Sequence, residues 1–263
     1  MKKFVAVILL FSTLGSFANA DSLFIRKIYD EALVKGQCYE NLRTLCKNIG
    51  ARITGSAEAK MAIKWGHDLL QSYGFDNVYL QEIKVPHWER GNPEAAWLMN
   101  EAGELSKLNI LALGGSVSTE GLLEGEIILV ETVEDLEKIG LENIKGKIVF
   151  FNEPFDQTQI NTFKAYGACV DQRWIGASKA ALFEAKAVII RSLAQSTDEH
   201  AHTGSMHYED GVMKIPAAAI STVDADILVE WLKKGKVFIK MEMDCRFFPD
   251  EISYNVIAEM TGH

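Results

Sequence analysis

The sequence lacks the motifs of the common covalent and nucleotide-dependent enzymes. It contains no GxSxG nucleophile motif, and none of its four cysteines stands in a recognisable catalytic context. Gly114 and Gly115 follow a predicted strand, but they lack the GxGxxG spacing and the helix that would bind a phosphate. We interpret this glycine pair as a turn.

Cysteine is scarce, and no pair has the CxxC spacing of a zinc knuckle or a redox site. If Cys38 and Cys46 share one helix, their Cα atoms are about 12 Å apart, whereas a disulfide needs about 4.4 to 6.8 Å. A disulfide between Cys169 and Cys245 remains open. The alternative is that both are buried as small apolar side chains.

Long apolar runs are also missing after the first 20 residues. Lys2 and Lys3 precede an apolar run at residues 4–11 and the small residues of the stretch Ala-Asn-Ala at 18–20, a pattern typical of a signal peptide cleaved before Asp21. The run is much shorter than the roughly 20 apolar residues of a membrane helix. The sequence therefore predicts a signal peptide over residues 1–20 and export to the periplasm or the extracellular space, without a transmembrane segment.

Positive charge is in the minority. The chain has 27 Lys and Arg against 36 Asp and Glu, a net charge of -9 that becomes -11 once Lys2 and Lys3 are removed. This balance disfavours nucleic acid and anionic membrane as partners. Apolar residues make up 48% of the chain, which is enough for a real core in one or two domains.

The hydrophobic pattern predicts a mixed α/β fold. Helices are predicted from residue 23 to near Gly36, at 38–48 and at 54–74, followed by a strand at 78–85. From residue 108 onward, strands are predicted at 109–113, 126–130, 147–152, 187–191, 216–220 and 237–246, and helices at 133–139, 162–185 and 223–234. A last strand is predicted at 254–260. If it pairs with an element before residue 110, the middle of the chain is an inserted module whose ends lie close together.

One cluster contains residues of the kind that bind metals. It comprises His200, His202 and His207, with Asp198, Glu199, Glu209 and Asp210 nearby. An HxH pair on a strand puts both imidazoles on one side, and a third histidine could complete a zinc site. Because these residues stand among turn formers, a polar surface loop remains the alternative.

The stretch VPHWERG, residues 85–91, combines the end of a strand with a large aromatic and two opposite charges. We interpret it as a capped strand exit in which Trp88 packs and Glu89 pairs with Arg90 on the surface.

Several runs together resemble the carboxypeptidase Q branch of the zinc aminopeptidase family. They are IGARITGS (49–56), PHWERG (86–91), GKIVFFN (146–152), HTG (202–204), DGVMKIPAAAI (210–220) and NVIAEMTG (255–262), in the family's order and at about its spacing. The resemblance implies a secreted metallo-exopeptidase with a phosphorylase/aminopeptidase-like α/β catalytic domain, interrupted by an inserted protease-associated (apical) α/β domain. It divides the chain into a signal peptide (1–20), an N-terminal part of the peptidase domain (21–112), the protease-associated domain (113–250) and a return strand (251–263).

The resemblance also implies which parts of the site this chain carries. In the family, two zinc ions are held by histidine, aspartate and glutamate, and a glutamate acts as general base. These residues come after the position that matches Gly262, and His263 precedes the strand that would place the first ligand. The catalytic sheet is then incomplete, and we expect no catalytic residue, no metal ligand and no bound zinc in this chain.

One residue of the chain matches a family position close to the substrate. The position matching His202 lies in the apical domain, whose loops are expected to lean over the active site. His202 is therefore a candidate for substrate contact, with an ordinary turn histidine as the alternative. The family also suggests a homodimer.

Two functional hypotheses follow. The first is an N-terminal fragment of an exported carboxypeptidase Q-like enzyme that hydrolyses dipeptides or short peptides when complete and is inactive alone. The second is a non-catalytic secreted binding protein that uses a protease-associated domain to contact peptides or a partner enzyme.

Overall fold

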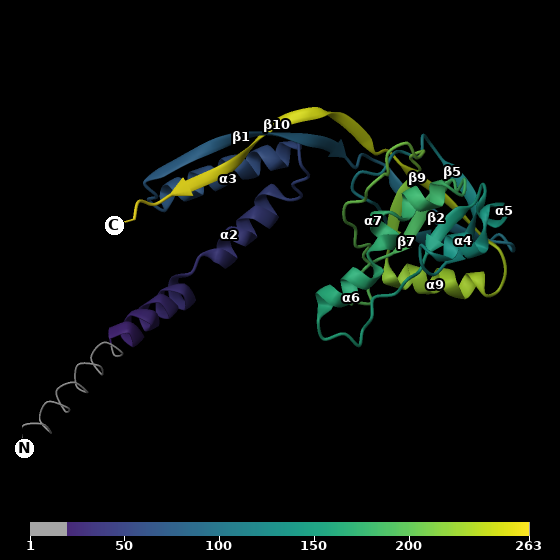
Figure 1. The fold of residues 1–263 in the computed structure, drawn as a ribbon, viewed down its shortest axis with the longest axis horizontal. Coiled ribbons are helices and arrows are strands. Elements are labelled where there is room, and N and C mark those ends of the chain that lie inside the picture. Colours follow the sequence, from purple (N-terminus) through teal and green to yellow (C-terminus); the bar gives the residue numbers. More distant parts are fainter. Residues whose placement is uncertain (1–19, 263) are drawn as a thin grey trace, which may run out of the picture. The chain divides into compact units, whose positions relative to one another are not determined.

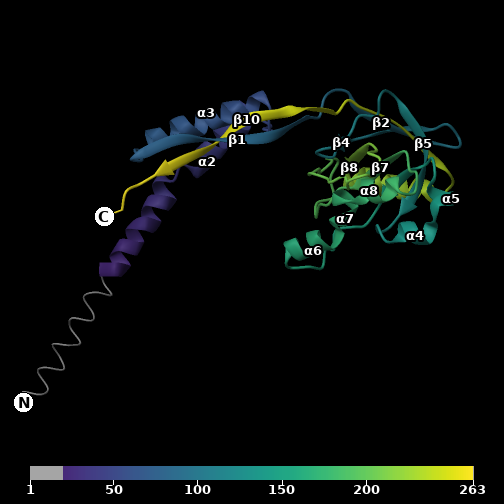
Figure 2. The same cartoon turned by 45° about the horizontal axis from the view of Figure 1, so that its top comes forward.

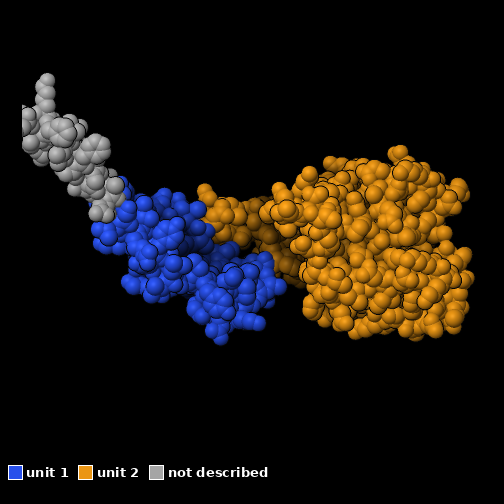
Figure 3. All heavy atoms as spheres, turned by 90° about the horizontal axis from the view of Figure 1, so that it is seen from below, with its two compact units in different colours: residues 1–52, 57–80, 256–263 blue, residues 53–56, 81–255 orange. Residues whose placement is uncertain are grey.

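The computed structural model describes residues 20–262 and divides the chain into two compact units. Unit 1 comprises residues 1–52, 57–80 and 256–263, and unit 2 comprises residues 53–56 and 81–255 (Figure 3). The predicted signal peptide lies outside the described residues, apart from Ala20. Across residues 20–262, no helix is long and apolar enough to cross a membrane.

Unit 1 is largely helical, as the sequence predicted. Residues 20–35 form a first helix, followed by α2 (Cys38–Thr44), the π-helical turn η1 (Leu45–Ile49) and α3 (Ala57–Ser72) (Figure 1). None of the described residues of unit 1 is buried, and apolar side chains of the first helix are open to solvent, with Leu33 81% exposed. The described part of this unit therefore has no core of its own.

A two-stranded sheet joins early and late parts of the chain. It pairs β1 (Asn77–Glu89) with β10 (Arg246–Glu259) (Figure 2), and the Asn255 side-chain amide donates to Gln81 Oε1 at 3.1 Å. The last strand thus pairs with an element before residue 110, the condition under which the middle of the chain was expected to be an inserted module. β10 begins well before the predicted start at residue 254, because both strands of such a sheet are edge strands, where Pro249 is tolerated.

Unit 2 is built around an eight-stranded sheet with the order β3-β2-β9-β5-β6-β7-β8-β4. The strands are β2 (Glu94–Asn100), β3 (Leu105–Leu108), β4 (Ile110–Ala112), β5 (Leu123–Val130), β6 (Ile148–Phe151), β7 (Ala187–Arg191), β8 (Ala217–Ile220) and β9 (Val237–Met243). The four strands β5, β6, β7 and β8 are parallel, and β9 and β4 flank them in antiparallel pairing. The parallel strands therefore place their carboxyl ends at one edge of the sheet.

The central strands are buried on both faces. In β6, Ile148 and Phe150 pack into a core that includes Leu228 of α9 (Thr222–Leu232). Val149 and Phe151 pack into a second core on the other face. That core is covered by α4 (Asp135–Ile139), α5 (Leu141–Ile144) and α8 (Gly176–Ala181). Burial on both faces explains why these strands have continuous apolar sequences.

The single helix predicted at residues 162–185 is wrong. The chain instead forms α6 (Thr162–Cys169), α7 (Asp171–Trp174) and α8. Ile175 leaves the helical region, with φ −121° and ψ −5°, and this turns α8 so that Ala177 and Ala180 pack against the sheet. Packing on the sheet has overridden the local helical preference.

The sequence did not predict β2 and β3. β2 pairs with β9 along its whole length, from Glu94 opposite Met243 to Asn100 opposite Val237. Unit 2 consequently includes residues 81–112, which were predicted to belong to the N-terminal part of the peptidase domain.

All four cysteines are free thiols. Cys38 and Cys46 are exposed, whereas Cys169 and Cys245 are buried, so the disulfide considered between the latter two is not formed. Burial raises the pKa of Cys169 to about 11 and that of Cys245 to about 12. Both thiols are therefore protonated and unreactive at neutral pH.

Candidate functional site

The carboxyl edge of the parallel strands is where ligands commonly bind in open α/β sheets. β6, β7 and β8 end there at Phe151, Arg191 and Ile220. The connection from β7 to β8, residues 192–216, carries His202 and contains only an isolated bridge at Ser205. A loop of this length without its own helix is typical of a functional segment.

Hydrogen bonds fix the central part of this loop to the sheet. The His202 amide donates to Ser192 Oγ at 2.8 Å, and Thr203 Oγ1 donates to the Ala112 carbonyl at 3.0 Å. The Gly114 amide donates to the Gly204 carbonyl at 2.9 Å. The backbone that carries the His202 side chain is thus held in place at three consecutive residues.

The His202 imidazole is itself accessible. Its side chain is 45% exposed, and Nε2 lies 3.4 Å from Asp198 Oδ2. The pKa of Asp198 is lowered, mainly by the hydrogen bond from the His200 amide, then by the Ser196 side chain and by His202. An ionised carboxylate beside a half-exposed imidazole leaves the rest of the ring free to contact a ligand.

The PHWERG run meets this loop at Ala112. Arg90 Nη2 donates to the Ala112 carbonyl at 3.2 Å, the same oxygen that accepts from Thr203. Glu94 Oε1 accepts from the Ala112 amide at 2.8 Å and lies 3.3 Å from Arg90 Nε. Burial raises the pKa of Glu94, against the opposing effects of the Ala112 amide and Arg90. The segment around Arg90 and the loop around Thr203, which are distant in sequence, therefore both bind the backbone of Ala112 at the end of β4.

The predicted surface pair between Glu89 and Arg90 is wrong. Glu89 Oε1 instead lies 3.0 Å from His87 Nε2, while Arg90 turns inward to Glu94. The packing predicted for Trp88 is confirmed, since it is 8% exposed. His87 and Glu89 stand two residues apart in β1 and so point to the same face of the strand, whereas Arg90 lies beyond the end of β1.

Acidic groups surround the neighbouring part of this edge. Burial raises the pKa of Glu153, which follows β6, and so do the carboxylates of Glu134, Asp171, Asp135 and Glu131. Arg191, the last residue of β7, is paired through Nη1 with Asp226 Oδ1 at 2.7 Å.

The histidine cluster does not form a metal site. His207 stacks on Trp174 with 5.4 Å between ring centroids, and Glu209 pairs with Lys179 at 2.7 Å. Among residues 20–262, no three histidine, cysteine, aspartate or glutamate side chains are grouped to hold a metal, and His263 lies outside this range. The donors present do not fit a two-zinc centre, so we derive no step through zinc for these residues.

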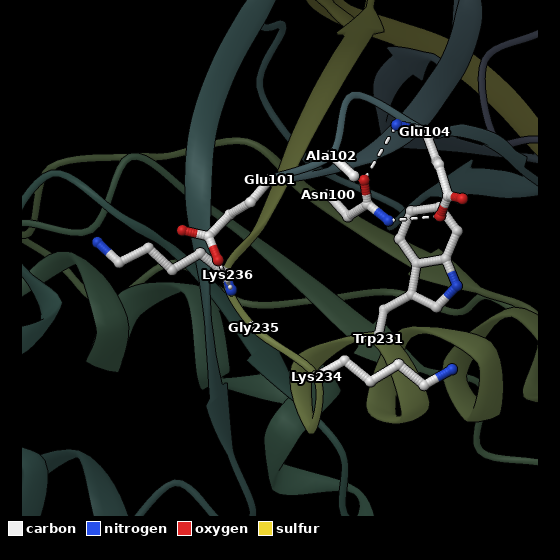
Figure 4. Close-up of a pocket in the computed structure, with 8 residues that line it drawn as sticks. All are labelled: Asn100, Glu101, Ala102, Glu104, Trp231, Lys234, Gly235 and Lys236. Atoms are coloured by element: carbon white, nitrogen blue, oxygen red, sulfur yellow. Dashed lines mark hydrogen bonds between the residues drawn. The ribbon is translucent and has the colours of Figure 1, made fainter.

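A separate cavity of about 220 Å³ lies at the C-terminal end of α9. The loop of residues 192–216, called the His202 loop below, instead adjoins the N-terminal end of α9, where the Val223 amide donates to the Asp198 carbonyl. Figure 4 shows the turn after β2, where the Asn100 amide donates to Glu104 Oε2 at 2.6 Å, beside Trp231 and Lys234. The cavity is lined by acidic side chains, by basic side chains and by the aromatic ring of Trp231. No sequence motif indicated this cavity.

Two further residues contact the site, Glu94 and Arg173, and neither was predicted from the sequence. Glu94 stands four residues after Arg90, and in an extended chain this spacing does not predict a contact between the two side chains. Glu94 accepts from the Ala112 amide only because β4 lies close to it in the fold. Arg173 contacts the loop at Ser205, as described below. Neither residue carries a signal that a single sequence could reveal.

No family model matches the chain. It is 39% identical to carboxypeptidase Q of Xenopus laevis over 231 residues, covering 87% of this chain and 46% of that protein. It is 36% identical to carboxypeptidase Q of Homo sapiens, covering 89% and 47%, and 34% identical to that of Bos taurus, covering 92% and 49%. The chain thus spans about half the length of the curated relatives it matches.

Solved structures agree with this result. A peptidase M28 precursor from Shewanella amazonensis SB2B matches with a TM-score of 0.85 and 34% identity, over 91% of this chain and 54% of that one. A zinc aminopeptidase from Bacillus subtilis matches with a TM-score of 0.54 at 22% identity, over 84% and 45%, and shows the fold alone.

The predicted fold class is confirmed, because the mixed α/β architecture is that of the M28 peptidases. Over about half of that protein's length, the chain is homologous to carboxypeptidase Q.

Proposed function

We propose that this chain is the N-terminal part of an exported, carboxypeptidase Q-like metallo-exopeptidase that hydrolyses dipeptides or short peptides. The observation that supports this is identity of 34% to 39% to carboxypeptidase Q across 87% to 92% of the chain. In this proposal two zinc ions activate water in the whole enzyme, and their ligands and the general base come from the remainder of that protein. Export through the signal peptide at residues 1–20 and a homodimer belong to the same proposal.

The two units differ in how much of each is buried, and this difference fits the proposal. Unit 2 has two buried cores, which suits a protease-associated module that folds by itself. The described residues of unit 1 have no core, which suits an incomplete part of a peptidase domain that packs against further sequence. In the proposal, unit 2 presents the His202 loop to the peptide.

The 263-residue chain is expected to bind no stoichiometric zinc and to leave dipeptides intact, since its described residues offer no donor set. Elemental analysis after dialysis against zinc, and mass spectrometry of a dipeptide mixture, measure both. The matched control is the chain extended along its source reading frame to the length of the relatives, which is expected to gain zinc and activity. Chelator-sensitive hydrolysis by the 263-residue chain would contradict the proposal.

In the extended enzyme, His202→Ala is expected to raise KM about fivefold and leave kcat nearly unchanged, as for the loss of one hydrogen bond to the bound peptide. Steady-state kinetics on one dipeptide provides the measurement. His200→Ala is the control, because that side chain is exposed in the same loop. Equal effects of the two substitutions would remove His202 from the site.

A non-catalytic binding protein is the second candidate, favoured by the self-contained core of unit 2. It predicts a stable monomer with one sharp cooperative melt for the 263-residue chain. The first proposal predicts instead that the exposed apolar side chains of unit 1 cause association. Sedimentation and calorimetry on the same sample separate the two.

A further inference from the structure

Arg173 is a buried cation without a carboxylate partner. It lies in α7, is 9% exposed, and has no aspartate or glutamate oxygen within 4.0 Å among the described residues. The other arginines of unit 2 are all paired: Arg90 with Glu94 at 3.3 Å, Arg191 with Asp226 at 2.7 Å and Arg246 with Asp244 at 2.6 Å. Burial of an uncompensated guanidinium is costly, so this exception calls for a ligand.

Uncharged oxygens hold the Arg173 side chain against the His202 loop. Nη1 donates to the Ser205 carbonyl, Nη2 donates to the Tyr166 hydroxyl, and the guanidinium carbon lies 5.7 Å from the Tyr166 ring. These bonds orient the guanidinium but do not neutralise it.

Glycine at position 204 makes this approach possible. A Cβ atom there would lie 2.6 Å from Arg173 Nη1, closer than any real contact. Gly204 is two residues after His202, a distance of at most about 7 Å along the chain. The Arg173 guanidinium, on α7, therefore contacts the same loop that carries the half-exposed His202 imidazole.

We propose that Arg173 binds the terminal carboxylate of a peptide ligand, with His202 alongside. A guanidinium presents a planar fork of N–H donors that matches a carboxylate, and the match is strongest where water is largely excluded. The ligand's identity as a peptide rests on the function proposed above. The role of Arg173 as an anion-binding group rests on its burial and its missing partner.

Binding is tested on the 263-residue chain in the presence of a chelator, so that hydrolysis plays no part. The probes are N-acetyl-alanyl-alanine, whose only charge is its terminal carboxylate, its C-terminal amide, and N-acetyl-glutamyl-alanine amide, whose only carboxylate is on a side chain. NMR titration is expected to show the free acid binding about tenfold more tightly than the other two.

Arg173→Met is expected to abolish this preference, and Arg173→Lys, which keeps the charge but not the fork, to weaken it. Arg246→Met is the matched control, because it removes the same charge from an exposed side chain; it is expected to bind like the wild type. If Arg173→Met fails to fold, the inference is tested by Arg173→Lys, which is expected to prefer the free acid less strongly than the wild type does.

Three results would overturn the inference: equal binding of acid and amide by the wild type, unchanged binding by a folded Arg173 variant, or equal binding of the side-chain carboxylate. None of them depends on whether the chain hydrolyses peptides, so a failure here is distinct from a failure of the proposed function.

Discussion

Alanine in place of Gly91 is expected to destabilise unit 2 by about 3 kcal/mol or more. Gly91 has φ +70°, and a Cβ atom there would lie 1.7 Å from the Asp244 carbonyl oxygen and 2.7 Å from its carbon. Since both atoms are backbone, no side-chain rotation can relieve the overlap. Chemical denaturation followed by circular dichroism measures the loss.

Gly103→Ala separates this overlap from the cost of the backbone angle alone. Gly103 has φ +82° but no atom within 4 Å of its virtual Cβ. Its substitution is expected to cost about 1 to 2 kcal/mol. Similar losses at positions 91 and 103 would show that the contact with Asp244 has no part in the effect.

Trp88→Ala is expected to cost about 3 to 5 kcal/mol, the range for removing a large aromatic from a core. Trp88 is 8% exposed and belongs to the core that also contains Phe150, and its Nε1 donates to the buried Ser116 carbonyl at 2.9 Å. The variant loses both the packing and this hydrogen bond. The free energy of unfolding is measured as for position 91.

Trp88→Phe keeps most of the packing and leaves the Ser116 carbonyl without its donor, so about 1 to 3 kcal/mol is expected. Trp97→Ala is the control, because Trp97 is 36% exposed on β2. A loss at Trp97 as large as that at Trp88 would show that burial does not govern the difference.

The parallel strands were the most predictable part of the fold. The prediction at residues 187–191 coincides with β7, and that at 216–220 differs from β8 by one residue. Strands buried on both faces need continuous apolar sequence, which a single chain displays plainly. Here local composition and tertiary environment agree.

Elements whose limits depend on distant partners were harder to predict. β2 is recognised by its pairing with β9, more than a hundred residues later. The break at Ile175 depends on how α8 meets the sheet, which the helical pattern of residues 162–185 does not contain.

The contacts of the candidate site were even harder to predict from the sequence than the limits of these elements. His202 was selected from a resemblance to a family, and its role in substrate contact stays a prediction. Its anchors, Ser192 and the Ala112 carbonyl beside Thr203, lie in other strands or strand ends. Arg173 could not be recognised either, because the absence of a carboxylate partner is a property of the folded chain.

The pairing of β1 with β10 sets a delay during synthesis on the ribosome. Roughly 160 residues separate the two strands, and their translation takes on the order of 10 to 30 s. Throughout that interval β1 has no partner strand, and an unpaired edge is a template for aggregation with other nascent chains. Glu82, Lys84 and Glu89 place charges along β1, and charges of this kind discourage such encounters until residue 246 and those after it emerge.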